Sequence, residues 1–417
     1  MRNLSVLHIN ESDRLGGAGR SAYRIHESLR RMGLRSRMLV HRKSTNDDDV
    51  RLISSANVRF FDLASYHTFE RLSMQYLFYP SSFLLVNHPW FKEADVIQIF
   101  NTHENYFAHT ALPLISRRRP TVWRLSDMWA LTGHCTHSLD CERWMSGCGS
   151  CPLLSDYPAL RWDTTAMLWK LKRWVYARSL LNIVAPSKWI EALARRSPLL
   201  GNFPVHHIPN GIDTTVFAPQ EQSVARRTLG IDESRKVILF SSHQILNRQK
   251  GGDLMVDALG RLALSYDREK ILLLVVGKGA EEWKVDVPFA VMRMGHVSDD
   301  KMMAAIYSAA DIFVLPTLAD TFPNAVLESM SCGTPPITFA VGGCPELVRH
   351  METGYLAQYK DPVDLAKGMS LLLDDDELRT RLRQRGLEVV QLEYQRDLEA
   401  KRFKSLYEDI YNERAAA

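Results

Sequence analysis

Short apolar runs alternate with amphipathic helical repeats along most of the chain, and this alternation constrains the fold more than any other feature. In the first half, an apolar run at 4–9 leads into a glycine-rich turn at 15–19 and then into a helical repeat that ends at Gly33. Further strands are predicted at 37–41, 96–100, 121–125 and 182–185. Strands that alternate with helices form a parallel sheet covered on both faces.

The second half repeats this pattern. Its predicted strands are 237–241, 271–276, 291–294, 312–315 and 336–339, and its predicted helices are 252–264, 301–308, 324–331 and 364–373. We therefore expect an α/β chain of two Rossmann-like, doubly wound domains that face each other across a cleft. The expected bounds are 1–205 for the first domain, 206–386 for the second, and 387–417 for a C-terminal helix that packs back on the first domain.

Composition excludes several classes of protein. The 417 residues suggest two or three domains, and 46% apolar with 24% charged residues is typical of a soluble globular chain. No apolar run reaches the roughly 18 residues of a membrane-spanning helix, and the first apolar stretch is too short for a signal peptide. We therefore expect a cytoplasmic protein.

The charge is distributed unevenly between the two halves. Residues 1–205 hold 27 Lys and Arg against 17 Asp and Glu, a net +10, whereas residues 206–417 hold 25 against 31, a net −6. The first half is therefore expected to bind an anionic partner, for which phospholipid, a lipid pyrophosphate and nucleic acid are all candidates.

Two motifs in the second half suit a nucleotide. Asp320 lies in a loop before a helix, and Glu328 lies about one turn inside that helix, where a carboxylate can accept hydrogen bonds from a ribose diol. Arg248 and Lys250 stand beside glycines before another helix, an arrangement that can cradle a diphosphate. Without a ligand role, Glu328 would be an ordinary surface glutamate, and Arg248 and Lys250 would belong to a basic surface turn. Two strand ends belong to the same candidate site, at Gly277 and Met294.

Four of the six cysteines lie close together, at Cys135, Cys141, Cys148 and Cys151. The last two have a good zinc-ligand spacing, and the first two fit zinc less well. The sequence leaves a structural zinc, free thiols and a redox disulfide open. A catalytic zinc is not expected, because four thiolates would leave it no open position.

The order and spacing of several blocks resemble the family 4 retaining glycosyltransferases, which have the GT-B fold of two Rossmann-like domains. The blocks are Gly16-Gly17, residues 208–213 (Ile-Pro-Asn-Gly-Ile-Asp), Lys250-Gly251, residues 307–316 and residues 328–335. The resemblance covers nearly the whole chain. It implies a hexosyltransferase that uses a nucleotide-diphosphate sugar and retains the anomeric configuration without a catalytic metal.

The resemblance also implies roles for single residues. Lys250 and Arg248 would neutralise the diphosphate, Glu328 would hold the ribose, and Gly16 and Gly17 would approach the donor phosphate and sugar. Asp320 stands where the family usually has glutamate, and its shorter side chain bears on the choice of donor sugar. The remaining implied donor-site residues are Gly277, Met294, Phe322 and Asn324.

Residues 127–152 further resemble a branch that acts in bacterial exopolysaccharide and colanic-acid-like assembly. In that branch a histidine usually precedes Asp127, but this chain has Ser126. Either His103 or His134 substitutes for it, or the histidine is dispensable, or the chain is weakly active. The candidate catalytic residues are therefore Asp127, His103, His134, Asp320 and Glu328.

Residues 167–178 interleave Trp and Tyr with Lys and Arg, and residues 60–91 are rich in Phe, Tyr and Leu. Such a helix either packs into a core or lies at a membrane interface. With the basic triplet at 117–119, the second reading predicts peripheral contact with the inner membrane face and an acceptor glycan on a polyprenyl pyrophosphate.

Two other functions remain open at the level of sequence. One is a nucleotide-sugar epimerase on the same fold, and the other is a non-catalytic sugar-binding or nucleic-acid-binding scaffold. Nucleic-acid recognition motifs are missing, so we expect no nucleic-acid partner. The glycine loop at 16–19 lacks the G-x-G-x-x-G spacing of a nicotinamide dehydrogenase.

Overall fold

The structure, a computed structural model, describes residues 4–416 and contains two units. Among the described residues, unit 1 consists of residues 4–209 and 397–416, and unit 2 consists of residues 210–396. The chain thus crosses from one unit to the other twice. The crossings lie 4 and 10 residues beyond the bounds of 205 and 386 expected from sequence.

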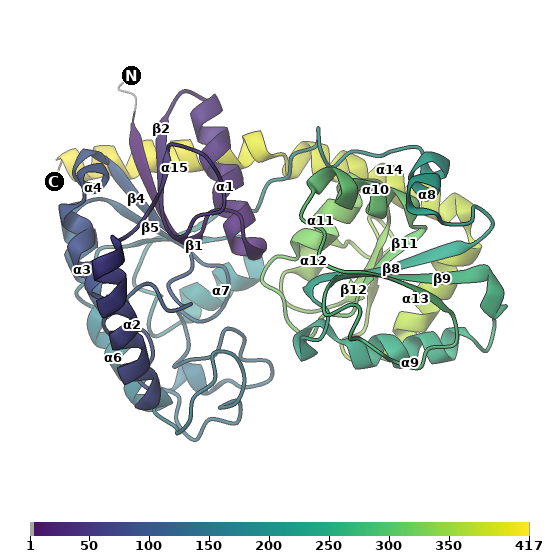
Figure 1. The fold of residues 1–417 in the computed structure, drawn as a ribbon, viewed down its shortest axis with the longest axis horizontal. Helices are drawn as coiled ribbons and strands as arrows, with labels where there is room; N and C mark the ends of the chain where they lie inside the picture. The colour runs from purple at the N-terminus through teal and green to yellow at the C-terminus, as the bar shows by residue number, and fades with distance from the viewer. Residues whose placement is uncertain (1–3, 417) are drawn as a thin grey trace. The chain divides into compact units, whose positions relative to one another are not determined.

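Unit 1 is built on a sheet of seven parallel strands in the order β3-β2-β1-β4-β5-β6-β7. Figure 1 labels β1, β2, β4 and β5 of this sheet. The central β1 pairs with β2 on one side and with β4 on the other, so the strand order reverses at β1. The strands are β1 (Ser5–Ser12), β2 (Arg35–Arg42), β3 (Val50–Leu52), β4 (Val96–Ile99), β5 (Thr121–Arg124), β6 (Asn182–Ala185) and β7 (Val205–His207).

Helices cover both faces of this sheet because successive strand residues point to opposite sides. Val6 and Val40 pack on one face with α1 (Gly16–Arg31) and with α15 (Arg396–Ala416), whose apolar side chains include Phe403 and Tyr407. Ile9 and Ile97 pack on the other face. The remaining helices of unit 1 are α2 (Ala56–Arg71), α3 (Pro80–Leu84), α4 (Pro89–Glu93), α5 (Leu112–Arg118), α6 (Thr165–Tyr176) and α7 (Lys188–Arg196).

Unit 2 has a sheet of six parallel strands in the order β10-β9-β8-β11-β12-β13. Its strands are β8 (Lys236–Gln244), β9 (Ile271–Lys278), β10 (Ala290–Met294), β11 (Ile312–Leu315), β12 (Pro336–Phe339) and β13 (Tyr355–Ala357). Its helices are α8 (Gln222–Leu229), α9 (Gly252–Leu262), α10 (Asp300–Ala309), α11 (Asn324–Ser331), α12 (Cys344–Leu347), α13 (Pro362–Asp374) and α14 (Asp376–Glu393).

The two faces of the second sheet are also both buried. Leu239 and Phe313 pack with residues of α10 and α11, while Phe240 and Val314 pack with residues of α9 and α13. The expectation of two doubly wound, Rossmann-like sheets is therefore confirmed.

The expected continuous helix over the last thirty residues is wrong in one respect. α14 ends at Glu393, and α15 begins at Arg396. Between them Gln395 forms a parallel bridge with Ile212, whose N–H donates to Tyr394 O at 2.8 Å. This pairing breaks the helix where the chain leaves unit 2. Within residues 4–416, no helix is both long and apolar enough to cross a bilayer.

Candidate functional site

In unit 2, polar residues gather in the loops that follow β8 and β11. A short turn at Arg248–Lys250 follows β8, and Asn247 caps it through its side-chain oxygen. Lys250 Nζ lies 2.8 Å from Asp320 Oδ2, which belongs to the loop between β11 and α11. The two side chains are about one-fifth exposed, so the pair is open at one side. Strands of a parallel sheet end at one edge, which is where ligands of such sheets bind.

Backbone contacts fix these loops against each other. Leu318 N–H donates to Gln249 O at 2.7 Å. A Cβ on Gly251, whose φ is +71°, would lie 1.9 Å from Pro316 O. A Cβ on Gly342 would likewise lie 2.2 Å from Asp320 O, which accepts from the N–H of Gly343 at 2.9 Å. Lys250 and Asp320 are therefore held in place by backbone that only glycine permits at two positions.

Glu328 lies in the second turn of α11 and is 7% exposed. Its Oε2 accepts from Tyr307 OH of α10 at 3.2 Å. At the start of the same helix, Asn324 Oδ1 accepts from Asn210 Nδ2 at 2.8 Å. The carboxylate is thus oriented by a neighbouring helix, as a group that receives ligand hydroxyls requires.

The other residues predicted for the donor take different positions. Arg248 is exposed on the same turn as Lys250. A Cβ on Gly277 would lie 1.9 Å from Ser242 O, so glycine allows β8 and β9 to approach at their ends. Phe322 is buried in the core, and Met294 packs partly against that core. The Phe322 side chain therefore belongs to the core, whereas the Met294 side chain is only partly covered.

In unit 1, Gly16 and Gly17 open helix α1. Leu15 precedes them and offers no side-chain cap to the first amides of the helix, which leaves these N–H groups for another acceptor. Gly16 has a φ of +69°, and no atom lies within 4 Å of where its Cβ would be. Asp13 anchors the loop: its carboxylate accepts from the backbone N–H and hydroxyl groups of Ser44 and Thr45 at 2.7–2.9 Å.

Of the two histidines proposed to replace the residue missing at Ser126, the structure brings His103 to Asp127. His103 Nε2 lies 2.7 Å from Asp127 Oδ2, and Asp127 Oδ1 accepts from Trp129 N–H at 2.8 Å. Burial lowers the pKa of His103, but the charge and hydrogen bond of Asp127 outweigh it, so this pKa is raised. Burial likewise raises the pKa of Asp127, but His103 outweighs it, so that pKa is lowered.

The second nitrogen of His103 has no partner in the part of the chain that the structure describes. Nε2 must donate to the ionised carboxylate, which leaves Nδ1 as an acceptor in the neutral ring. Nδ1 is buried and has no hydrogen-bond partner among the residues that the structure describes. The rings of Tyr76, Trp129 and Tyr157 surround the imidazole. Asp127 therefore fixes the orientation of the imidazole within this aromatic surround.

His134 lies elsewhere, among the residues that line the pocket of the cysteines. His134 Nδ1 is 3.0 Å from Pro158 O, and its Nε2 is 3.3 Å from Cys151 Sγ. All four cysteines of the loop line this pocket, and none of them is in a disulfide. As the side chains stand, no three His, Cys, Asp or Glu residues within 4–416 are grouped to hold a metal ion.

The burial of Lys172 was not predicted from sequence, where this residue is one of the cations interleaved with Trp and Tyr at 167–178. The side chain is buried, and Nζ donates to Trp129 O at 2.6 Å and to Thr132 O at 2.9 Å. Burial lowers the pKa of Lys172 to about 7. The contact of Tyr307 with Glu328 was not predicted from sequence either. The only sequence signal for this tyrosine is its place in the 307–316 block, because it lies on a different helix from the carboxylate.

The comparison with protein families covers most of the chain. The family model described as Glycosyltransferase Family 4 matches residues 15–216, and the one described as Glycosyl transferases group 1 matches residues 221–389.

Curated relatives match over shorter stretches. The chain is 26% identical over 216 residues to N-acetyl-alpha-D-glucosaminyl L-malate synthase of Bacillus anthracis, which covers 50% of this chain and 55% of that protein. It is 32% identical over 192 residues to D-inositol 3-phosphate glycosyltransferase of Stackebrandtia nassauensis, which covers 42% of each. The chain thus spans about half the length of the curated relatives it matches.

Solved structures agree over the whole chain. Sucrose-phosphate synthase of Thermosynechococcus elongatus has a TM-score of 0.68 at 17% identity, with 99% of this chain and 100% of that chain covered. Anabaena HepE, solved with UDP and glucose, has a TM-score of 0.66 at 16% identity, with 97% and 99% covered. At these identities the likeness shows the fold. The chain therefore has the GT-B fold, with a family 4 match over residues 15–216 and a group 1 match over residues 221–389.

Proposed function

We propose that the protein transfers a hexose from a nucleotide-diphosphate sugar to a lipid-linked or oligosaccharide acceptor, with retention at the anomeric carbon, in bacterial surface polysaccharide synthesis. The observation that carries the proposal is the Lys250–Asp320 pair, set by glycine-dependent backbone at the strand ends of unit 2. It places a cation and a sugar-binding carboxylate side by side, as a ligand that joins a diphosphate to a sugar requires.

The roles follow from the chemistry of each group. Lys250 and Arg248 neutralise the diphosphate, Glu328 binds the ribose diol and Asp320 binds hydroxyls of the donor sugar. The N–H groups of Gly16, Gly17 and the start of α11 suit phosphate oxygens. The bond from the anomeric carbon to the diphosphate breaks, and a bond to an acceptor oxygen forms. The acceptor proton passes to the departing diphosphate.

Two protein cations supply the charge that the leaving diphosphate needs, so the proposed reaction requires no catalytic metal. His103 and Asp127 take the place left by Ser126: the carboxylate holds the imidazole, and Nδ1 meets a sugar hydroxyl. This role depends on an observed contact, whereas His134 is held by Cys151 and Pro158.

We also propose that unit 1 touches an anionic membrane surface. Helix α2 has the reverse of the usual burial pattern of an amphipathic helix. It buries Asp62, which accepts from Ser81 N–H, and exposes Phe60, Phe61 and Leu63. On α6, Trp174 is exposed and lies under the guanidinium of Arg178. Exposed aromatics beside cations suit the headgroup region of an anionic bilayer.

A liposome test checks the membrane proposal. The double variant Phe60→Ser/Phe61→Ser should lose sedimentation with vesicles that contain anionic phospholipid. Leu264→Ser is the control, because Leu264 is exposed in unit 2. Equal binding of both variants would refute the contact through α2.

The test of the reaction is turnover with separate UDP-, GDP-, ADP- and CDP-hexoses, with and without a polyprenyl-pyrophosphate glycan. We expect release of nucleoside diphosphate with one of the donors, and only when the acceptor is present. The new glycosidic bond should have the same anomeric configuration as the bond between sugar and diphosphate in the donor. Conversion of the donor without acceptor would instead indicate an epimerase. An inverted product bond would refute retention.

A further inference from the structure

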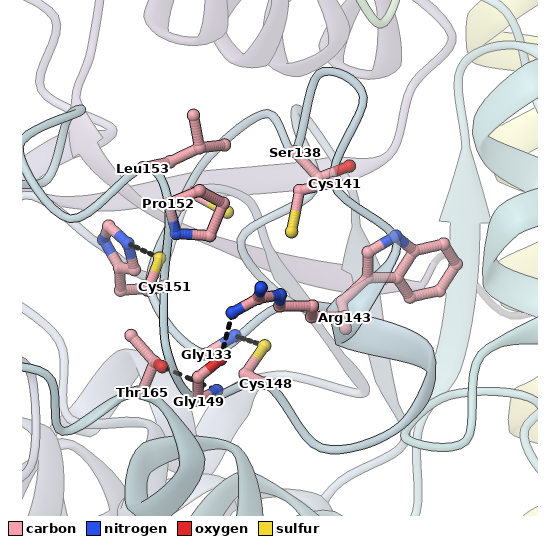
Figure 2. A pocket seen from close by; sticks show the side chains of 13 residues that line it. Gly133, Ser138, Cys141, Arg143, Cys148, Gly149, Cys151, Pro152, Leu153 and Thr165 are labelled. Carbon is pink, nitrogen blue, oxygen red and sulfur yellow. Dashed lines mark hydrogen bonds between the residues drawn. The ribbon is translucent and has the colours of Figure 1, made fainter.

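The cysteine pocket of unit 1 combines thiols with an imidazole whose lone pair faces them. It is formed by the loop between β5 and α6, and the half-buried Cys141, Cys148 and Cys151 line it (Figure 2). Cys135 also lines it but is buried. Apart from one short turn at Arg143–Met145, this loop has no regular structure to hold it between the two elements.

The hydrogen bonds of His134 determine which nitrogen faces the sulfur. Pro158 O can only accept, so Nδ1 must donate to it across 3.0 Å. In the neutral ring Nε2 then has a lone pair, and Nε2 is 3.3 Å from Cys151 Sγ. Metal-bound imidazoles typically donate their other N–H to a backbone carbonyl in this way. Two ligands of one tetrahedral zinc, at about 2.3 Å for sulfur and 2.0 Å for nitrogen, lie roughly 3.5 Å apart.

The turn that bears two of the thiols is fixed from the side of α6. Cys151 N–H donates to Asp163 Oδ2 at 2.6 Å, and Gly149 N–H donates to Thr165 Oγ1 at 2.9 Å. Cys148 Sγ accepts from Gly133 N–H at 3.2 Å. The two anchors keep both thiols on the pocket wall.

Two cations accompany the thiols without a carboxylate partner of their own. Within the described residues, buried Lys172 donates to two carbonyls and forms no ion pair, although a buried ammonium normally has a countercharge. Arg143 donates to Gly149 O and points among the sulfurs of Cys141, Cys148 and Cys151 (Figure 2). Three thiolates around a divalent metal carry one net negative charge. Lys172, which interacts electrostatically with Cys148, balances that charge in its protonated form.

We propose that Cys141, Cys148, Cys151 and His134 bind one zinc ion in a closed structural site, with Lys172 as the neighbouring countercharge. Binding releases three thiol protons to solvent and displaces the water ligands of the metal. The four ligand side chains must turn toward the centre of the pocket from their present positions. The Arg143 guanidinium must move out from between the sulfurs, to a position from which it can still donate to the backbone carbonyl of Gly149. Four protein ligands leave no open position, so the zinc fastens the loop and does not take part in transfer.

Metal analysis of the full chain, purified without chelator, tests the proposal. We expect about one zinc per chain in wild type, and less than one-fifth of that in Cys151→Ser and in His134→Gln. Ser146→Ala, an exposed position of the same loop, is the matched control and should keep its zinc. Cys135→Ala should keep it as well, because Cys135 is not one of the ligands.

Cobalt gives a readout that does not depend on a variant that folds. Wild-type protein stripped of metal and reduced should acquire thiolate-to-cobalt absorption with an end point of one cobalt per chain, and zinc should abolish it. Absence of zinc as purified together with absence of this absorption would overturn the site. Zinc lost in Cys135→Ala but kept in His134→Gln would overturn the ligand set in favour of four cysteines.

Discussion

The Lys250–Asp320 pair yields a prediction in which two substitutions have opposite effects on diphosphate binding. Lys250→Met removes the cation, and Asp320→Asn removes the carboxylate that occupies it at 2.8 Å. Both side chains are only about one-fifth exposed, so solvent screens the interaction weakly. A nucleoside diphosphate lacks the donor hexose. Its affinity therefore reports the contribution of Lys250 without that of a contact between Asp320 and the hexose.

The size of the effect follows from the contact. A hydrogen bond to a charged group contributes about 1.5–3 kcal/mol, and each 1.4 kcal/mol changes the affinity tenfold. Lys250→Met should therefore weaken binding of the nucleoside diphosphate by roughly 10- to 150-fold. Asp320→Asn frees Lys250 and removes a negative charge near the phosphates, so the same ligand should bind as well as to wild type or up to about tenfold more tightly.

Thermal unfolding with UDP, GDP, ADP and CDP first identifies the ligand that stabilises wild type, by about 2.7 kcal/mol at 100 times its dissociation constant. Calorimetric titration of that ligand then gives the affinity for both variants. Transfer should fall in both, because Asp320 is proposed to hold the donor sugar. Wild-type affinity in Lys250→Met, or equal losses in the two variants, would refute the reasoning.

Three further predictions concern other parts of the molecule. Glu328→Gln should lower kcat/KM for donor at least tenfold with an unchanged unfolding midpoint, measured by initial rates and calorimetry; normal turnover would exclude its ribose role. Because the pKa of His103 is raised, the stabilising positive charge of this residue is fully present below about pH 6.5 and is lost as pH rises through the pKa of the folded state. The free energy of unfolding should therefore fall over that pH range. In denaturant titrations, Asp127→Asn should make this pH dependence flatter. Gly251→Ala should destabilise by several kcal/mol because its Cβ meets a carbonyl at 1.9 Å, whereas Gly230→Ala, also left-handed but in open space, should cost about 1 kcal/mol.

The sheets could be predicted because their strands are buried on both faces and read as continuous apolar runs. β8 and β9 are the clearest examples, since seven residues of β9 are buried in succession. The edge strands β3, β7 and β13 have three residues each and were not predicted. A run that short has no periodicity, and only pairing with a neighbour makes it a strand.

The candidate site was predicted unevenly, for a physical reason. Lys250, Asp320 and Glu328 follow or begin regular elements, so their place at the strand ends follows from topology. The pairing of His103 with Asp127 depends on how two loops fold over the sheet edge, and the residues are 24 positions apart. Likewise, the break between α14 and α15 depends on a bridge to Ile212, which no local propensity indicates.

The return of α15 to unit 1 has a consequence for synthesis of the chain. Unit 2 is contiguous and can fold once residue 396 has emerged from the ribosome, whereas unit 1 must wait for residues 397–416. Until then the sheet face that Phe403 and Tyr407 cover remains exposed as an apolar surface. The half of the chain made first is therefore completed last.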